Sequence, residues 1–383
     1  MPRLRFPGFE GEWLEHNLED CLSVCCKRNK GRFTKEEVLS VSGEFGIVNQ
    51  IAFQGRSFAG ESIVNYKTIS PGLIVYTKSP LREAPYGIVK ASRATNGIVS
   101  PLYGVYSAND GINACFIEAY FANALRRNRY FKPLVNLGPK HTMCISDDGA
   151  LGGSIVIPKK DEQDKICELL DVLDSRITVQ RHLVELLKKH KRGLLRDVFE
   201  ENIEGDCYSF SEIASRRNEK IAPTKDSRLD CIELEHIEQE TGMLLGSVPL
   251  SGQNSLKNLC KPSDIVFGKL RPYLRKFIFA ENECAVSSET WVLTAADAIY
   301  PKFLFYLIQS EPFMRAASVS SGTKMPRSEW SNVANAKFYI PDRTRQETIA
   351  ACFSEIDRRI LVSQRILTAA QTCKRGLLQQ LFV

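Results

Sequence analysis

A lysine, an arginine and a tyrosine alternate along the sequence at Lys269, Arg271 and Tyr273. Alternate residues of an extended strand point to the same side, so this spacing predicts one shared face on a strand or on the loop that continues it. An arginine can bind guanine O6 and N7 with two hydrogen bonds, a lysine suits a phosphate, and a tyrosine can stack or hydrogen-bond. The three types together are typical of a DNA contact. Alternatively, Lys269 and Arg271 cap the strand end or pair with Glu281 or Glu283.

Four further basic residues are candidates for the same chemistry. Lys78 and Arg82 are the counterparts in the first half of the chain, and Lys324 and Arg327 lie in a glycine-containing loop. A base contact discriminates between sequences by about 1–3 kcal/mol, whereas a phosphate contact weakens binding to all sequences alike. The basic run Lys188–Arg192 falls in the last turns of a predicted helix, where cations favour the C-terminal dipole. We assign that run to the helix end and to a partner surface.

Motifs for catalysis are absent from the sequence. The chain has no G-x-x-x-x-G-K-[ST] phosphate loop and no Asn-Pro-Pro-aromatic or Asp-Pro-Pro-aromatic tetrapeptide, which an amino-group DNA methyltransferase is expected to carry. Its 12 cysteines include no C-x-x-C pair, and its 5 histidines stand apart from them. Asp147-Asp148-Gly149 is typical of a turn. We therefore predict no catalytic residues, no metal ligands and no cofactor held by this chain.

Charge and hydropathy bear on partners and location. The chain has 51 basic and 45 acidic residues, a net charge of +6, which by itself is weak evidence for a polyanionic partner. The basic residues recur in short sets, which favours phosphate contacts. The longest apolar stretches, such as Phe303–Ile308, are far shorter than the roughly 20 residues that cross a bilayer. The first residues lack the apolar core of a signal peptide. We expect a cytoplasmic protein with no membrane contact.

The sequence contains an internal repeat. Ile155–Phe199 realigns on Phe338–Phe382 at a constant offset of 183 without a gap. In each copy the stretch that follows a proline, Pro158 or Pro341, contains no further proline, which predicts two long helices. Their apolar residues keep an alternating 4–3 spacing, which is typical of a coiled-coil seam. The predicted helix-pairing residues are Leu173, Ile177, Gln180, Val184, Leu187, Lys191 and Leu194, and in the second copy Ile356, Ile360, Ser363, Leu367, Ala370, Lys374 and Leu377.

Polar residues interrupt the seam at the same places in both helices. One antiparallel register sets Gln180 opposite Lys374 and also sets Ser363 opposite Lys191. Polar seam residues commonly fix the register of such helices, at some cost in stability. The alternative is a pair of unrelated amphipathic helices, each packed on its own domain.

The blocks before the two helices also correspond. Pro71–Lys78 resembles Pro262–Lys269, and Gly97–Ser100 resembles Cys284–Ser287, as short strands separated by turns. A helical stretch follows in each block. The fold class is therefore predicted as α+β, with two similar mixed α/β domains separated and joined by two long helices that pair as an antiparallel coiled coil in a pseudo-two-fold repeat. The predicted bounds are 1–157 and 201–340 for the domains, and 158–200 and 341–383 for the helices.

Local sequence patterns along the chain match a known family. They are Leu4–Phe9 before Trp13, Ile232–Ile237, Asp264–Tyr273 and Ser321–Met325. One glutamine and one aspartate in each long helix match the family's signature: Gln163, Asp174, Gln346 and Asp357. Over essentially its whole length the chain resembles the specificity subunit of type I restriction-modification systems. The first domain departs from the family pattern at Tyr76–Ser79.

The resemblance implies a function and partners. Each globular block would be a target recognition domain that reads one half of a bipartite DNA sequence. The paired helices would be a spacer and a docking site for two methyltransferase (M) subunits, which modify adenine from S-adenosylmethionine. Restriction/motor (R) subunits could join to cut unmodified DNA. S-adenosylmethionine, Mg and ATP are then expected only in the partner subunits.

The sequence as a whole predicts a non-catalytic, sequence-specific DNA-binding subunit. It would read a bipartite, asymmetric target on double-stranded DNA and direct partner adenine-N6 methyltransferase and restriction subunits to it. The alternative is a coiled-coil, DNA-associated scaffold without sequence specificity, for which any DNA competes and salt alone governs binding. A self-sufficient nuclease or methyltransferase is disfavoured by the missing motifs.

Overall fold

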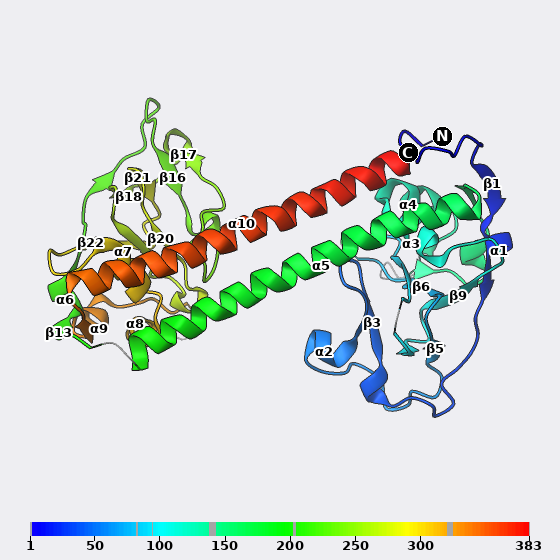
Figure 1. Cartoon of the computed structure of the whole chain (residues 1–383), viewed down its shortest axis with the longest axis horizontal. Helices are drawn as coiled ribbons and strands as arrows, with labels where there is room; N and C mark the ends of the chain where they lie inside the picture. Colours follow the sequence, from blue (N-terminus) through cyan, green and yellow to red (C-terminus); the bar gives the residue numbers. More distant parts are fainter. Residues whose placement is uncertain are drawn as a thin grey trace. The chain divides into compact units, whose positions relative to one another are not determined.

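The computed structural model describes residues 2–81, 83–93, 95–137, 143–201, 204–319 and 325–382. It shows a mixed α+β protein with two long helices, α5 (Lys160–Arg196) and α10 (Arg343–Leu381), drawn in green and in orange to red in Figure 1. The predicted fold class is confirmed. Two of the predicted DNA-contact residues, Arg82 and Lys324, lie outside the described residues.

The chain divides into two compact units, residues 1–178 with 368–383 and residues 179–367. The division falls within both long helices, so each helix contributes one part to each unit. The bounds predicted from the sequence instead separate the domains from the helices, and they stay a prediction.

A four-stranded antiparallel sheet forms the centre of the first unit. Its strands lie in the order β2 (Leu22–Val24), β9 (Gly104–Ala108), β6 (Leu73–Tyr76) and β7 (Val89–Ala91). The helix α3 (Ala114–Ala122) packs on β6 and β7 and buries Phe116 and Phe121 in the core. Each such large apolar side chain contributes about 1.5–3 kcal/mol when it leaves water.

Smaller elements complete the first unit. The strands are β1 (Leu14–Asn17), β3 (Leu39–Ser42), β4 (Gly46–Asn49), β5 (Lys67–Ile69), β8 (Gly97–Val99), β10 (Asn136–Leu137), β11 (Met143–Cys144) and β12 (Ser154–Ile157). The helices are α1 (Leu18–Cys21), α2 (Gln50–Gln54) and α4 (Ala124–Phe131), with 3-10 turns at Lys35–Glu37 and Gly149–Leu151. β12 pairs with β1 immediately before α5 begins, so the long helix starts from a strand anchored in this unit.

The second unit contains two larger sheets. One has the order β14 (Ala214–Arg216), β22 (Thr290–Ala295), β19 (Ile265–Gly268) and β20 (Phe277–Phe279). The other has the order β15 (Lys220–Ile221), β18 (Lys257–Cys260), β21 (Cys284–Val286), β16 (Asp230–Ile232) and β17 (Val248–Pro249). The remaining elements are β13 (Asp206–Ser209), β23 (Lys337–Ile340), α6 (Phe210–Ile213), α7 (Pro301–Leu307), α8 (Glu311–Ser318), α9 (Trp330–Ala334) and 3-10 turns at Leu234–His236, Leu250–Gly252 and Pro272–Leu274.

Strand pairing shows that the two units repeat one framework. Tyr76 on β6 pairs with Gly104 on β9, and Phe267 on β19 pairs with Trp291 on β22. Tyr76 and Phe267 are the residues that the sequence correspondence aligns. The lysines two positions after them therefore occupy the same place in the two folds.

The long helices place the predicted helix-pairing residues toward the protein interior. All of those residues are buried or half-buried. The helix α5 ends in one π-helical turn at Asp197–Glu201, and Leu195 and Phe199 enter the core of the second unit. A stripe of apolar residues at 4–3 spacing thus gives each helix one buried face, as the sequence predicts.

Polar contacts define the register of the helices. In the second unit the Gln180 side-chain amide donates to the Ser363 carbonyl oxygen over 3.0 Å, and Lys191 Nζ lies 2.7 Å from Asp357 Oδ1. The helices are therefore antiparallel, but the predicted register is wrong, because it set Gln180 opposite Lys374 and Ser363 opposite Lys191. A buried ammonium is stabilised far better by a carboxylate than by a neutral group. The apolar spacing alone is compatible with several registers.

The same ion pair recurs in the first unit, where Lys374 pairs with Asp174. These residues are the equivalents of Lys191 and Asp357 at the offset of 183. Lys191 is buried, whereas Lys374 is half-buried. The internal repeat therefore extends to the polar contacts between the helices, with a difference in burial between the two copies.

Candidate nucleic-acid interface

The loop from β19 to β20 holds three of the predicted DNA-contact residues. β19 is buried along its whole length because it lies between two other strands. The chain then turns: Arg271 adopts a left-handed φ of 53°, and Pro272–Leu274 form a 3-10 turn. The prediction of an extended stretch with alternating side chains is therefore wrong. Proline suits the first position of a helical turn, and the chain must reverse because Phe277 pairs back with Phe267.

Two side chains of this loop are open to solvent. Tyr273 is 60% exposed, and Arg271 is half-exposed with no ion partner in the described part of the chain. Among the described residues, no ion pair joins Lys269 or Arg271 to Glu281 or Glu283, which was the alternative interpretation of these cations. The loop thus presents a guanidinium group and an aromatic ring, the two groups most suited to base contacts and stacking.

Backbone pairing brings Arg327 to the same loop. Leu270 and Arg327 form an isolated antiparallel bridge, and the Arg271 amide donates to the Pro326 carbonyl oxygen over 2.8 Å. The Arg327 guanidinium forms a fork with Glu289, in which Nε lies 3.1 Å from Oε2 and Nη2 lies 3.2 Å from Oε1. Glu289 could not be predicted from the sequence, because it lies 38 positions from Arg327 and no spacing rule connects the two residues.

The charge balance of this cluster is positive. Hydrogen bonds from Arg327 hold the pKa of Glu289 below its ordinary value against the opposing effect of burial, and the charge of Lys269 adds to the shift. Glu289 is therefore an anion at neutral pH, and it interacts with the cations Arg327 and Lys269, while the Arg271 guanidinium adds a further positive charge to the same loop. The excess of cations favours a phosphodiester partner. We call Lys269, Arg271, Tyr273, Glu289 and Arg327 the β19-loop site.

In the first unit the equivalent lysine is held by a carboxylate. Lys78 Nζ lies 2.6 Å from Asp147 Oδ1, and Lys67 Nζ lies 2.5 Å from Oδ2 of the same group. Lys67 also donates to the Tyr103 carbonyl oxygen over 2.7 Å. Both lysine side chains are largely covered. The Lys78 ammonium is therefore turned toward the protein, and its role as a DNA contact stays a prediction.

Asp147 does more than take part in the turn that the sequence predicts, because it also pairs with Lys67 and Lys78. Burial opposes its ionisation, but hydrogen bonds and charges from the two lysines outweigh burial and hold the pKa of Asp147 below its ordinary value. The three charged residues come from β5, from the loop after β6 and from the segment before β12. Only the tertiary fold brings them together, so local sequence carries no signal for this cluster.

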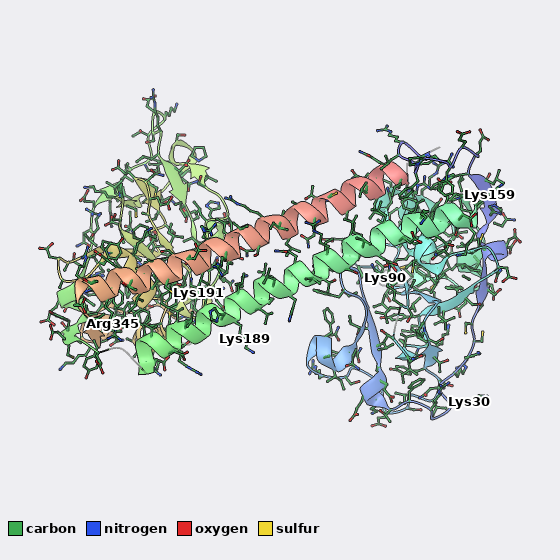
Figure 2. The ribbon with its side chains drawn as sticks, viewed as in Figure 1. Lys30, Lys90, Lys159, Lys189, Lys191 and Arg345 are labelled. Atoms are coloured by element: carbon green, nitrogen blue, oxygen red, sulfur yellow. The ribbon has the colours of Figure 1, made fainter. Side chains whose placement is uncertain are left out.

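The basic run on α5 has partners within the second unit. Lys188 lies 3.6 Å from Glu238, and Arg192 lies 3.1 Å from Glu240. Lys191 lies between the two helices, whereas Lys189 is exposed on α5 (Figure 2). Most of this run therefore anchors the helix to its own unit, and the predicted partner surface is reduced to residues such as Lys189.

Two curated proteins are similar to this chain in sequence. The type I restriction enzyme HindI specificity subunit of Haemophilus influenzae is 27% identical over 135 residues, which is 33% of this chain and 29% of that protein. The type I restriction enzyme MjaVIII specificity subunit of Methanocaldococcus jannaschii is 22% identical over 259 residues, which is 59% of this chain and 60% of that protein. Each match thus spans less than two thirds of the relative. No family model matches the chain.

Solved structures share the fold over nearly the whole chain. The type I restriction-modification S subunit from M. genitalium superposes with a TM-score of 0.63 and 13% identity, covering 100% of this chain and 99% of that one. The chain is similar to a type I specificity subunit. A structure on complex assembly and conformational transition of the type I R-M system gives a TM-score of 0.50 and 14% identity, with 97% of each chain covered.

The long helices of this specificity-subunit fold carry apolar residues outside their seam. In the second unit, Val179 and Leu183 on α5 are exposed, and so are their repeats Val362 and Ile366 on α10. Repeated positions on two antiparallel helices lie on the same side of the pair. This stripe was not predicted from the sequence, because the buried seam accounts for the stronger periodicity. A contiguous group of exposed apolar side chains is typical of a protein-binding surface.

Metal binding and membrane insertion find no support in the described ranges. Within them, no group of three or more His, Cys, Asp or Glu side chains could hold a metal ion. No helix in those ranges is long and apolar enough to cross a bilayer.

Proposed function

We propose that this chain is a non-catalytic, sequence-specific DNA-binding subunit of a type I restriction-modification system. It reads a bipartite, asymmetric target and directs adenine-N6 methyltransferase and restriction subunits to that target. The observation that carries this proposal is the repetition of one strand framework with different polar side chains at equivalent loops. Similarity to two type I specificity subunits supports the same proposal.

The difference between the two loops supports an asymmetric target. In the second unit the β19-loop site exposes Arg271 and Tyr273. In the first unit Lys78 and Lys67 are neutralised in part by Asp147. Two domains of equal fold but different chemistry would read different sequences, because base contacts depend on donor and acceptor positions.

The long helices support a docking role. The exposed positions Val179 and Leu183 have apolar equivalents at Val362 and Ile366, and the contact of Gln180 with Ser363 places all four on one stretch of the helix pair. Burial of an exposed leucine or valine contributes about 1.5–3 kcal/mol, so this stretch could contribute to the binding of a partner. We assign this surface to two methyltransferase (M) subunits, with restriction/motor (R) subunits joining the assembly. S-adenosylmethionine, Mg and ATP would be bound by those partners rather than by this chain.

The test is co-expression with a cognate methyltransferase subunit, followed by sequencing that maps N6-methyladenine. We expect one split, asymmetric motif. Arg271→Ala should alter or weaken recognition in one half of the motif only, because Arg271 is half-exposed and has no ion partner in the described part of the chain. Arg343→Ala is the matched control, since Arg343 is an exposed arginine that pairs with Glu347 on α10.

The second candidate is a coiled-coil scaffold that binds DNA without sequence specificity. The covered Lys78 and the interhelical contacts favour it, because both fit a purely structural role. It predicts methylation without a motif and competition by any DNA at a given salt concentration. A motif that is split and asymmetric would exclude this candidate.

A further inference from the structure

The second recognition domain contains an arginine whose orientation suits the reading of one base. We propose that Arg327 reads a guanine in the second half of the target and that Glu289 is the positioning residue that orients it. This inference rests on the proposed function and extends it, because it assigns one base and one residue to one half of the target.

Glu289 occupies only one edge of the Arg327 guanidinium group. Its carboxylate accepts hydrogen bonds from Nε and Nη2 at 3.1 and 3.2 Å. The opposite edge, formed by Nη1 and the second hydrogen of Nη2, meets no acceptor in the described part of the chain. Two parallel N–H donors match O6 and N7 of guanine. Adenine carries an amino donor in place of O6, so the same edge would face a donor there.

The backbone beneath Arg327 is held from both sides. The Arg271 amide donates to the Pro326 carbonyl oxygen, and the Ser328 amide donates to the Lys269 carbonyl oxygen, each over 2.8 Å. Ser328 itself is buried. The backbone of Arg327 is therefore positioned before DNA arrives, and the fork with Glu289 orients its guanidinium group. Such rigidity favours a directional base contact over a loose phosphate contact.

The exposure of the pair makes the proposal testable. The side chains of Arg327 and Glu289 are 54% and 33% exposed. Ion pairs this close to solvent contribute little to folding, so substitutions should leave the fold intact. The backbone of Arg327 also pairs with Leu270 of the β19-loop site, where the excess of cations attracts the phosphate backbone.

An equivalent of Glu289 is absent from the described part of the first domain. Leu102 stands at the place of Glu289 under the correspondence that relates Gly97–Ser100 to Cys284–Ser287. An exposed leucine cannot accept a hydrogen bond from an arginine. The guanine requirement should therefore be confined to the half of the target that the second domain reads.

The experiment uses the co-expressed chain and methyltransferase with the variants Arg327→Lys, Glu289→Gln and the double variant. Arg315→Ala is the control, as an exposed arginine of the same unit outside the β19-loop site. Motifs are mapped in cells, and the purified complex is titrated with duplexes that differ at each base pair of the second half. Arg327→Lys should lose roughly 5- to 150-fold of discrimination at one G·C pair, which corresponds to the 1–3 kcal/mol of a bidentate contact at 1.4 kcal/mol per tenfold.

The positioning role of Glu289 gives a separate readout. Glu289→Gln should relax the same base pair to a smaller extent, and the double variant should be no worse than Arg327→Lys alone, because both changes remove one contact. The control variant should keep the motif and the discrimination of the unsubstituted protein. A residue that only supported the fold would instead affect all base pairs and the thermal unfolding temperature.

Three results would overturn the inference. Equal weakening at every base pair would make Arg327 a phosphate contact. An unchanged motif in Arg327→Lys would make the pair a surface ion pair without a reading role. Relaxation of different base pairs by the Arg327 and Glu289 variants would refute the positioning role. If the unsubstituted complex shows no motif, the proposed function itself fails, and this outcome is distinguished from the other three before any variant is made.

Discussion

A lysine–aspartate pair joins α5 to α10 in each unit, and the two copies differ in burial. The Lys191 side chain is 4% exposed and lies beside Asp357, whereas the Lys374 side chain is 28% exposed beside Asp174. We expect Asp357→Ala to destabilise the second unit by about 3–5 kcal/mol, because the substitution leaves a buried ammonium without its counter-ion. The equivalent Asp174→Ala should cost at most about 1 kcal/mol, as is usual for solvated ion pairs.

The pH dependence separates a buried charge from lost packing. Burial lowers the pKa of Lys191, and the carboxylate of Asp357 partly opposes that shift. Between the folded pKa and the ordinary value of 10.5 the unfolded chain binds more protons than the folded chain, so stability rises with pH in that window. Removal of Asp357 lowers the pKa of Lys191 further. The destabilisation by Asp357→Ala should therefore shrink as the pH rises toward 10.5.

The assay is hydrogen exchange in increasing urea, followed separately for peptides of each unit, at pH 7 and at higher pH. The double variant Lys191→Met with Asp357→Leu removes both charges and should recover most of the lost stability, since apolar residues of similar volume replace a buried pair well. Equal losses for Asp357→Ala and Asp174→Ala would refute the reasoning from burial. A loss that is independent of pH would refute the reasoning from charge.

Other perturbations concern the core of the first unit and the outer face of the helices. Burial opposes the ionisation of Glu118, but Lys90, Arg93 and a backbone amide outweigh burial and hold the pKa of Glu118 below its ordinary value of 4.5. The ionised Glu118 side chain therefore stabilises the folded state above pH 4.5, and this stabilisation is lost as the pH falls through the pKa of the folded state. Glu118→Gln should cost about 2 kcal/mol at pH 7 and flatten acid unfolding. Phe382→Ala should cost about 3–5 kcal/mol in thermal or urea unfolding, because this ring is 1% exposed. Leu183→Glu with Ile366→Glu should abolish co-purification of the methyltransferase without changing the unfolding temperature, because both side chains are exposed.

Loop geometry marks where prediction from sequence failed. The residue types suit a shared site at Lys269, Arg271 and Tyr273, but their alternation does not make a strand. The chain turns at Pro272 because Phe277 must pair back on Phe267. A two-residue period is only a property of neighbours along the chain. Whether a segment stays extended depends on the strand to which it must return.

The sequence by itself determined the elements and their repetition. The offset of 183 and the 4–3 spacing are local patterns, and they are sufficient to place residues such as Ile177 and Ile360 on buried helix faces. The tertiary structure alone decided which charges meet. Lys191 pairs with Asp357, and Arg327 with Glu289, because folding brings distant carboxylates within hydrogen-bonding distance of these cations, of which Lys191 is also removed from water. Apolar periodicity is satisfied by several alignments of two helices, whereas a desolvated charge is satisfied only by the alignment that supplies its partner.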